Sequence, residues 1–231
     1  CTAGRFRWYF GSDETVHIIE GEVEVSADGD GPTWLRAGDS AIFRAGSSPA
    51  ASRALLKGWR DRPGQCGLRY PLIRADQKDW PFDGTLDWLW PVAEAEGLPV
   101  ATMAWRFLPE FGRIAERHPG LRLIIDHCGL IRHEKGAAAF ADIDAVTALA
   151  RFPNVALKAT GAPGYSQQAY PFRDIHDGLH RLYDAFGPDR FFWGTDITRM
   201  PCSWTQCITL FTEELPWLHG PSLERVMAGA V

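Results

Sequence analysis

Two patterns of hydrophobic and polar residues divide this chain. The first is the alternation of glutamate and valine that ends the sequence ETVHIIEGEVEV at residues 14–25, which is the period of a half-buried β-strand. The segment TWLRAGDSAIFRAG at residues 33–46 continues this β-rich pattern. Its Gly38 and Asp39 favour a tight turn between two more short strands. Residues 1–46 are therefore predicted to form a short antiparallel β segment, arranged as a meander.

The second pattern begins after the small, flexible sequence SSPAASR at residues 47–53, which we interpret as a linker or a fusion join. From residue 54 onward, short apolar runs alternate with stretches whose apolar residues recur every three or four positions. This order is typical of β-strands alternating with α-helices in a parallel sheet or barrel. Five strands are predicted, within residues 67–73, 99–105, 121–129, 154–161 and 190–198. The third of the intervening helices has its apolar stripe at residues 140–149.

Composition and charge narrow the classes of function. The 231 residues are 45% hydrophobic and include ten tryptophans, so the chain can bury the core of one large domain or two small ones. Its net charge of −5 comes from interspersed acidic and basic residues, without a basic stripe that favours nucleic acid or an anionic membrane. The expected partner is a small-molecule substrate, with no nucleic acid and no membrane.

Cysteine usage indicates the compartment. Five cysteines at irregular spacing fit a reduced, cytoplasmic protein better than a secreted disulfide scaffold. No apolar run approaches the roughly 18 residues of a membrane span, and no signal-peptide pattern is present. We therefore expect a cytoplasmic location.

Three predicted strand ends, taken together, resemble those of one family. They are IIDHCG at residues 124–129, NVALKATG at residues 154–161, and FFWGTDIT at residues 191–198 after the sequence GPDR. With WRDRPGQCGLRY and DWLWPVAEAEGLPV upstream, residues 54–231 resemble the amidohydrolase-related family of metal-dependent TIM-barrel hydrolases and decarboxylases. This stretch is shorter than the about 250 residues of a full barrel. The resemblance therefore implies about strands four to eight of an incomplete TIM-like (β/α) barrel.

The N-terminal segment has a resemblance of its own. RFRWYF, DETVHIIEGEVEV and LRAGDSAIFRAG stand in the same order as in a cupin of the ureidoglycine-aminohydrolase or ethanolamine-utilisation type. Glu14 matches a metal-site glutamate of cupins, but the accompanying HxH is replaced within RFRWYF. The predicted fold class is α/β: an incomplete TIM-like barrel preceded by a short cupin-like β segment, in a fused or misassembled gene product.

The barrel resemblance implies a divalent metal, zinc or manganese, that lowers the pKa of a bound water and polarises the substrate carbonyl. The family's ligands are an HxH pair after strand one, one histidine each after strands five and six, and an aspartate after strand eight. His127 matches the strand-six histidine, and Asp196 matches the aspartate, which in the family is also the general base. No HxH occurs in the chain, and Met103 stands near the strand-five position. Two ligands remain, where a catalytic zinc has at least three protein ligands.

Four further residues are predicted to contact the substrate. Arg69 points from a strand end, where it can clamp a carboxylate with two hydrogen bonds, although a structural salt bridge explains an arginine there equally well. Lys158, Tyr165 and Arg199 are weaker candidates for the same pocket, on position alone. Asp196 has a structural alternative too, since an aspartate at such a junction commonly caps the next helix.

The leading hypothesis is a hydrolase that cleaves a C–O or C–N bond of a small carboxylated substrate, a lactone or an amide. Non-oxidative decarboxylation on the same fold is an alternative. The absent HxH motivates another, a catalytically incompetent remnant or binding module. A separate small-ligand site in the cupin-like segment ranks lowest, because few strands are there to enclose it. Open sheet edges and the tryptophan-rich stretch at residues 80–90 also favour a homo-oligomer.

Overall fold

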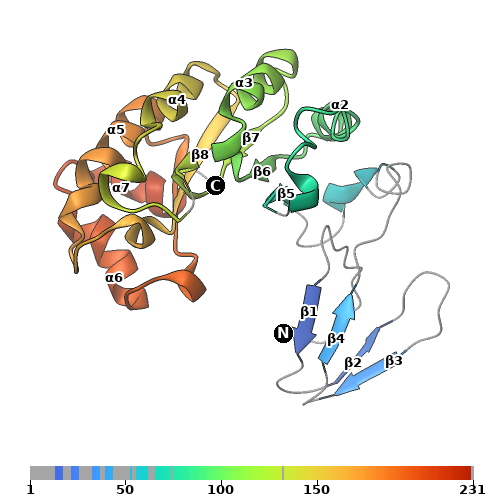
Figure 1. The fold of residues 1–231 in the computed structure, drawn as a ribbon, viewed down its shortest axis with the longest axis horizontal. Coiled ribbons are helices and arrows are strands. Elements are labelled where there is room, and N and C mark those ends of the chain that lie inside the picture. The colour runs from blue at the N-terminus through green and yellow to red at the C-terminus, as the bar shows by residue number, and fades with distance from the viewer. Residues whose placement is uncertain are drawn as a thin grey trace. The chain divides into compact units, whose positions relative to one another are not determined.

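The protein is represented by a computed structural model that describes residues 14–17, 22–25, 33–36, 40–43, 53, 56–61, 66–73, 75–131 and 133–229. The chain divides into two compact units, Cys1–Ala54 and Leu55–Val231. The strands of the smaller unit are blue in Figure 1, and the larger unit runs from teal to red. No helix within the described ranges has both the length and the apolar character needed to cross a membrane.

Four short strands make up nearly all of the described part of the N-terminal unit. They are β1 (Glu14–His17), β2 (Glu22–Val25), β3 (Thr33–Arg36) and β4 (Ser40–Phe43). In β2 the two valines are half-buried and the two glutamates are exposed. This confirms the period-two pattern predicted for the segment.

The strand pairing differs from the predicted meander. β1 pairs antiparallel with β4, and β2 pairs antiparallel with β3, in two separate two-stranded sheets. A meander requires β3 to pair with β4, across the turn expected at Gly38 and Asp39, which lie outside the described residues. The meander was wrong because a turn-forming sequence fixes where the chain bends but not which strand it pairs with. In the sequence, the paired strands β2 and β3 both lie between β1 and β4, which pair with each other.

The larger unit is built on a parallel sheet with the strand order β5-β6-β7-β8-β9. The strands are β5 (Leu68–Tyr70), β6 (Val100–Thr102), β7 (Leu123–Ile125), β8 (Val155–Thr160) and β9 (Phe191–Gly194). All five lie within the predicted segments, and each pairs with its neighbour in sequence. Within the described residues β5 and β9 are the two ends of the sheet, so the barrel is not closed, as predicted.

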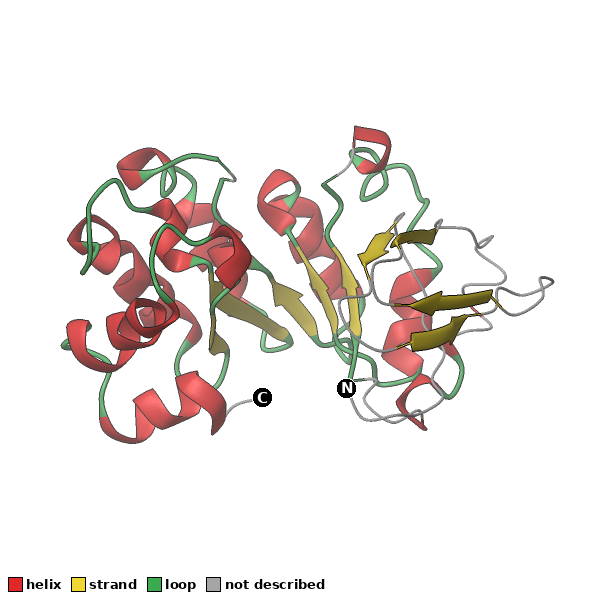
Figure 2. Cartoon of the chain, turned by 90° about the horizontal axis from the view of Figure 1, so that it is seen from below, coloured by secondary structure: helices red, strands yellow, loops and turns green. Residues whose placement is uncertain are grey.

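Helices follow the strands as in a chain of βα repeats. They are α2 (Leu89–Ala95), α3 (Leu108–Arg117), α4 (Ile143–Thr147), α5 (His176–Phe186), α6 (Trp204–Thr209) and α7 (Gly220–Glu224). Figure 1 shows α2, α3, α4 and α5 following one another along one side of the sheet, and Figure 2 shows the helices in red beside the yellow strands. The side chains between these helices and the sheet form the main hydrophobic core.

Alternate residues of each strand separate the two faces of the sheet. Leu123 and Ile125 of β7, and Leu157 of β8, are 0% exposed and belong to the core shared with the helices. Lys158 follows Leu157 on the opposite face and is only half-buried. That second face is the one on which charged side chains gather at the carboxyl ends of the strands.

The third predicted helix is shorter than its apolar stripe. Phe140 lies in a turn before α4, and Leu149 lies in the 3-10 turn Ala148–Arg151 after it. Ile143, Val146 and Leu149 are nevertheless buried, as the stripe predicts. The stripe predicted which side chains are buried even though the backbone changes between α and 3-10 geometry. Both geometries place residues three apart on about the same face.

Gly178, in the first turn of α5, lets that helix contact the ring of Phe140. A Cβ atom on residue 178 would lie 2.2 Å from Cε1 and 2.4 Å from Cδ1 of the ring. Gly178→Ala should therefore lower the free energy of unfolding by about 1–3 kcal/mol, the usual cost of overpacking, although alanine is the better helix former. Urea unfolding measures this. In a Phe140→Leu background the methyl group has room, so an equal cost of Gly178→Ala in both backgrounds would contradict the explanation.

Candidate functional site

The candidate site lies where three neighbouring strands end. His127 follows β7, Thr160 is the last residue of β8, and Asp196 follows β9. All three line a cavity of about 340 Å³, together with Met103, Tyr165 and Arg199. The carboxyl ends of parallel strands are where α/β folds place their chemistry, and a volume of this size suits a small molecule.

The His127 imidazole is held on both ring nitrogens. Its Nδ1 lies 2.8 Å from Thr160 Oγ1, and its Nε2 lies 3.3 Å from Nη2 of Arg69. The hydroxyl of Tyr165 donates a hydrogen bond of 3.1 Å to the backbone carbonyl of His127. The ring therefore has little freedom to rotate, and Tyr165 fixes the backbone that carries it.

The backbone at both central residues is in the left-handed region. His127 has φ 52° and Asp196 has φ 53°. A residue with a Cβ atom pays a conformational cost of about 1–2 kcal/mol there. Such conformations persist where the surroundings enforce them, and they cluster at functional sites, which gives His127 and Asp196 a functional interpretation independent of the sequence motif.

Burial lowers the pKa of His127. The carboxylates of Asp126 and Asp196 act in the opposite direction, and the positive charge of Arg69 adds to the lowering. The result is a neutral imidazole at pH 7, because even the ordinary histidine pKa lies below that pH.

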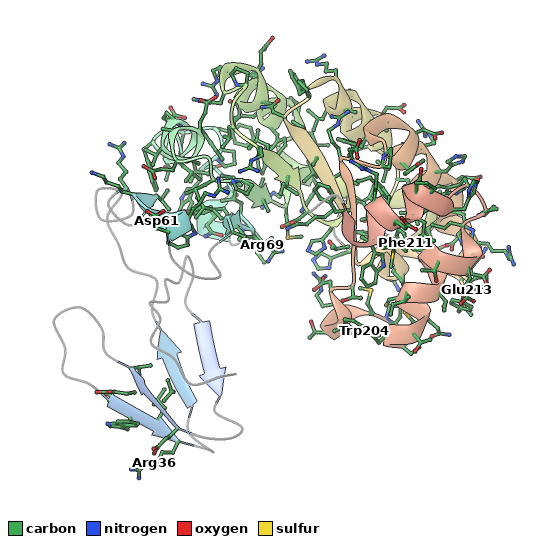
Figure 3. All side chains as sticks on the ribbon, turned by 180° about the vertical axis from the view of Figure 1, so that it is seen from behind. Arg36, Asp61, Arg69, Trp204, Phe211 and Glu213 are labelled. Atoms are coloured by element: carbon green, nitrogen blue, oxygen red, sulfur yellow. The ribbon has the colours of Figure 1, made fainter. Side chains whose placement is uncertain are left out.

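Asp126 is the centre of a charge cluster that the sequence did not single out. Its side chain is only 2% exposed, with Oδ2 2.7 Å from Arg69 Nε and Oδ1 3.1 Å from Lys158 Nζ. Arg69 reaches it from β5, where Figure 3 labels the residue, and Lys158 reaches it from β8. Asp126 thus neutralises two cations that come from opposite sides of β7.

Asp196 faces the pocket instead of capping the turn that follows it. Its side chain makes no capping hydrogen bond to that turn. Its Oδ2 lies 3.7 Å from Nη1 of Arg199 and 3.9 Å from Nδ1 of His127. The structural alternative of a helix cap is therefore not what the carboxylate does here.

The structure gathers the predicted site residues into two adjoining groups. His127, Asp196, Tyr165 and Arg199 line the cavity. Arg69 and Lys158 meet at Asp126, which directly precedes His127 in the chain. Sequence reasoning missed Asp126 and also missed Thr160 and Lys135, which line or support the pocket. The signal for Asp126 was its position directly after a buried strand. A carboxylate there is expected to be buried, and a buried carboxylate requires a partner.

Solved structures share this fold. An amidohydrolase from Burkholderia multivorans with bound zinc has a TM-score of 0.66 and 23% sequence identity, covering 79% of this chain and 68% of that one. A putative 2-pyrone-4,6-dicarboxylic acid hydrolase from Pseudomonas putida has a TM-score of 0.51 and 20% identity, covering 76% of this chain and 73% of that one. These similarities establish the TIM-barrel-like fold of the larger unit.

The side chains present do not fit a catalytic zinc ion. Within the described ranges, no three His, Cys, Asp or Glu side chains are placed to hold a metal. Nε2 of His127 faces the Arg69 guanidinium, and both oxygens of Asp126 are paired with cations. Met103 lines the pocket with a thioether, which is a poor ligand for a hydrolytic metal.

Comparison of the sequence with family models gives two matches, which overlap over residues 33–56. Residues 1–56 match the model described as an EutQ-like cupin domain, and residues 33–219 match the model described as amidohydrolase. The 4-sulfomuconolactone hydrolase of Hydrogenophaga intermedia is 30% identical over 154 residues, which cover 61% of this chain and 48% of that protein. The chain thus spans about half the length of this curated relative. The amidohydrolase match covers most of the sequence and includes all five parallel strands and the His127–Asp196 pocket, so the chain belongs to the amidohydrolase family.

Proposed function

We propose that this chain hydrolyses a C–O or C–N bond of a small carboxylated substrate, with a lactone as the first choice and an amide as the second. The observation that carries the proposal is the convergence of His127 and Asp196, both with left-handed backbone, on one pocket at the carboxyl ends of β7 and β9. The likeness to a lactone hydrolase supports the choice of a lactone.

Asp196 is the general base in this proposal. Its carboxylate takes a proton from a water molecule as the water oxygen attacks the substrate carbonyl carbon, and it returns the proton to the leaving oxygen or nitrogen when the C–O or C–N bond breaks. The neutral His127, whose Nδ1 lies 3.9 Å from the carboxylate, forms the wall of the pocket beside the base without adding charge. No step is assigned to a metal, because the donor set around His127 does not fit one.

Positive charge around the pocket binds the substrate carboxylate. Arg199 and Lys135 line the cavity directly. Arg69 uses two of its five N–H donors on Asp126 and His127, and the others remain to contact an anion at the edge of the pocket, beside Lys158. Tyr165 contributes to the wall of the pocket while its hydroxyl holds the His127 backbone.

The test is a panel of carboxylated lactones and amides incubated with the purified full chain, with the products identified by mass spectrometry. Ring opening or amide cleavage with gain of one water supports the proposal. Release of carbon dioxide instead identifies the decarboxylase alternative. No turnover of any panel member, with substrate binding retained, identifies a binding module or a remnant.

A further inference from the structure

The Arg69 guanidinium lies between a carboxylate and an imidazole, two groups that commonly bind metal ions in proteins. Its Nε donates to Asp126 Oδ2 at 2.7 Å, and its Nη2 lies 3.3 Å from Nε2 of His127. A cation is thus already present at the carboxylate and the imidazole, and it is one that the chain itself supplies.

The chemistry of arginine fixes the state of the histidine. A guanidinium has only donors, so the Nε2 atom that faces it must present its lone pair. In the neutral ring the proton then sits on Nδ1, where Thr160 Oγ1 accepts it at 2.8 Å. The Nε2 lone pair, which a metal ion would need, is committed to Arg69.

Several contacts keep Arg69 in this place. Asp126 is 2% exposed, and Lys158 Nζ on its other oxygen lies 3.1 Å away. If Arg69 turned away, the buried carboxylate would lose one of its two cations, and burying a charge with fewer partners is unfavourable. The guanidinium is therefore pre-positioned, and a metal ion must displace it and overcome its positive charge.

We propose that Arg69 acts as a built-in cation that takes the place of a divalent metal at His127 and keeps metal ions from binding there. The proposal concerns metal binding and the histidine tautomer, so it can be tested without measuring turnover. It makes Arg69 a positioning residue for the imidazole, in addition to any contact with substrate.

Zinc binding to the purified chain tests this directly. Arg69→Met should bind zinc at least about tenfold more tightly than the wild type by calorimetry, since a positive charge is removed and Nε2 and Asp126 Oδ2 are released. Arg113→Met is the matched control, because it removes an exposed arginine that pairs with Glu110 on α3 and does not line the pocket, and its zinc affinity should stay within about twofold of wild type. The added affinity should disappear in Arg69→Met with His127→Gln.

The imidazole tautomer gives a second readout that needs no metal. In protein labelled with ¹⁵N-histidine, the His127 signals, assigned by their loss in His127→Gln, should show the proton on Nδ1 in the wild type. In Arg69→Met the proton should be shared with Nε2. Two outcomes would overturn the proposal: a wild-type ring with its proton on Nε2, or wild-type zinc binding that is as tight as in Arg69→Met and requires His127. The wild-type spectrum decides the matter even if Arg69→Met does not fold.

Discussion

Asp196→Asn should lower turnover of a lactone substrate by about 10²–10⁴-fold, the range that a positioned general base contributes. Asparagine has nearly the same shape as aspartate, so it keeps the wall of the pocket, but it cannot accept the proton of the attacking water. The left-handed backbone at residue 196 also tolerates asparagine, since asparagine adopts that conformation readily. The loss should therefore appear in kcat, with substrate binding and thermal stability close to those of the wild type.

Asp144→Asn is the control for this prediction. Asp144 is an 88% exposed side chain that pairs with Arg181 on the surface, away from the pocket residues. Its replacement makes the same chemical change without touching the cavity, so kcat should stay within about twofold of wild type. Steady-state kinetics on both variants, in EDTA so that added metal plays no part, measure the difference. If Asp196→Asn retains wild-type turnover, Asp196 is not the base.

The fold of the larger unit could be predicted because its signals are local. Each strand is an apolar run that ends in small or polar residues. Along each helix, the apolar residues that become buried are spaced three or four residues apart. Met103 and the absence of HxH could be read from the sequence in the same way. These features need only the identity of neighbouring residues, which the sequence states directly.

The charge cluster could not be predicted because it depends on distances across the sheet. Arg69, Asp126 and Lys158 are separated by many residues, and they meet only because β5, β6, β7 and β8 pair in sequence order with a defined register. From the sequence, Arg69 and Lys158 were candidate substrate contacts, with a structural salt bridge as an equal alternative for Arg69. The position of Asp126 at a strand end indicated a buried carboxylate that needs a partner, but only the register shows that Arg69 and Lys158 are both its partners.

The strand pairing of the N-terminal unit failed for a related reason. β3 and β4 are close in sequence and have a turn-forming segment between them, which favours a hairpin on local grounds. The observed pairing of β1 with β4 joins strands that are far apart in the segment. Such long-range pairing is decided by how the faces of the strands are buried, and four-residue strands carry too few residues to show that in advance.

The stability of the charge cluster should be strongly non-additive. Asp126 has two cationic partners, and Arg69 and Lys158 have side chains that are 49% and 31% exposed. Arg69→Met or Lys158→Met alone should lower the free energy of unfolding by only about 1 kcal/mol, because the other cation still pairs with the carboxylate. The double variant leaves Asp126 as a buried, unpaired charge and should cost about 3–5 kcal/mol.

Removing the carboxylate as well should restore most of the loss. In the triple variant with Asp126→Leu, apolar side chains replace the whole cluster, and such replacements are commonly neutral or stabilising. Urea unfolding of all four variants in EDTA, followed by tryptophan fluorescence, gives the comparison. If the loss of unfolding free energy in the double variant is no larger than the sum of the two single losses, then Asp126 becomes hydrated or finds another partner when both cations are removed. Recovery in the triple variant would instead show that these charges are retained for what they do at the pocket, since the fold is as stable without them.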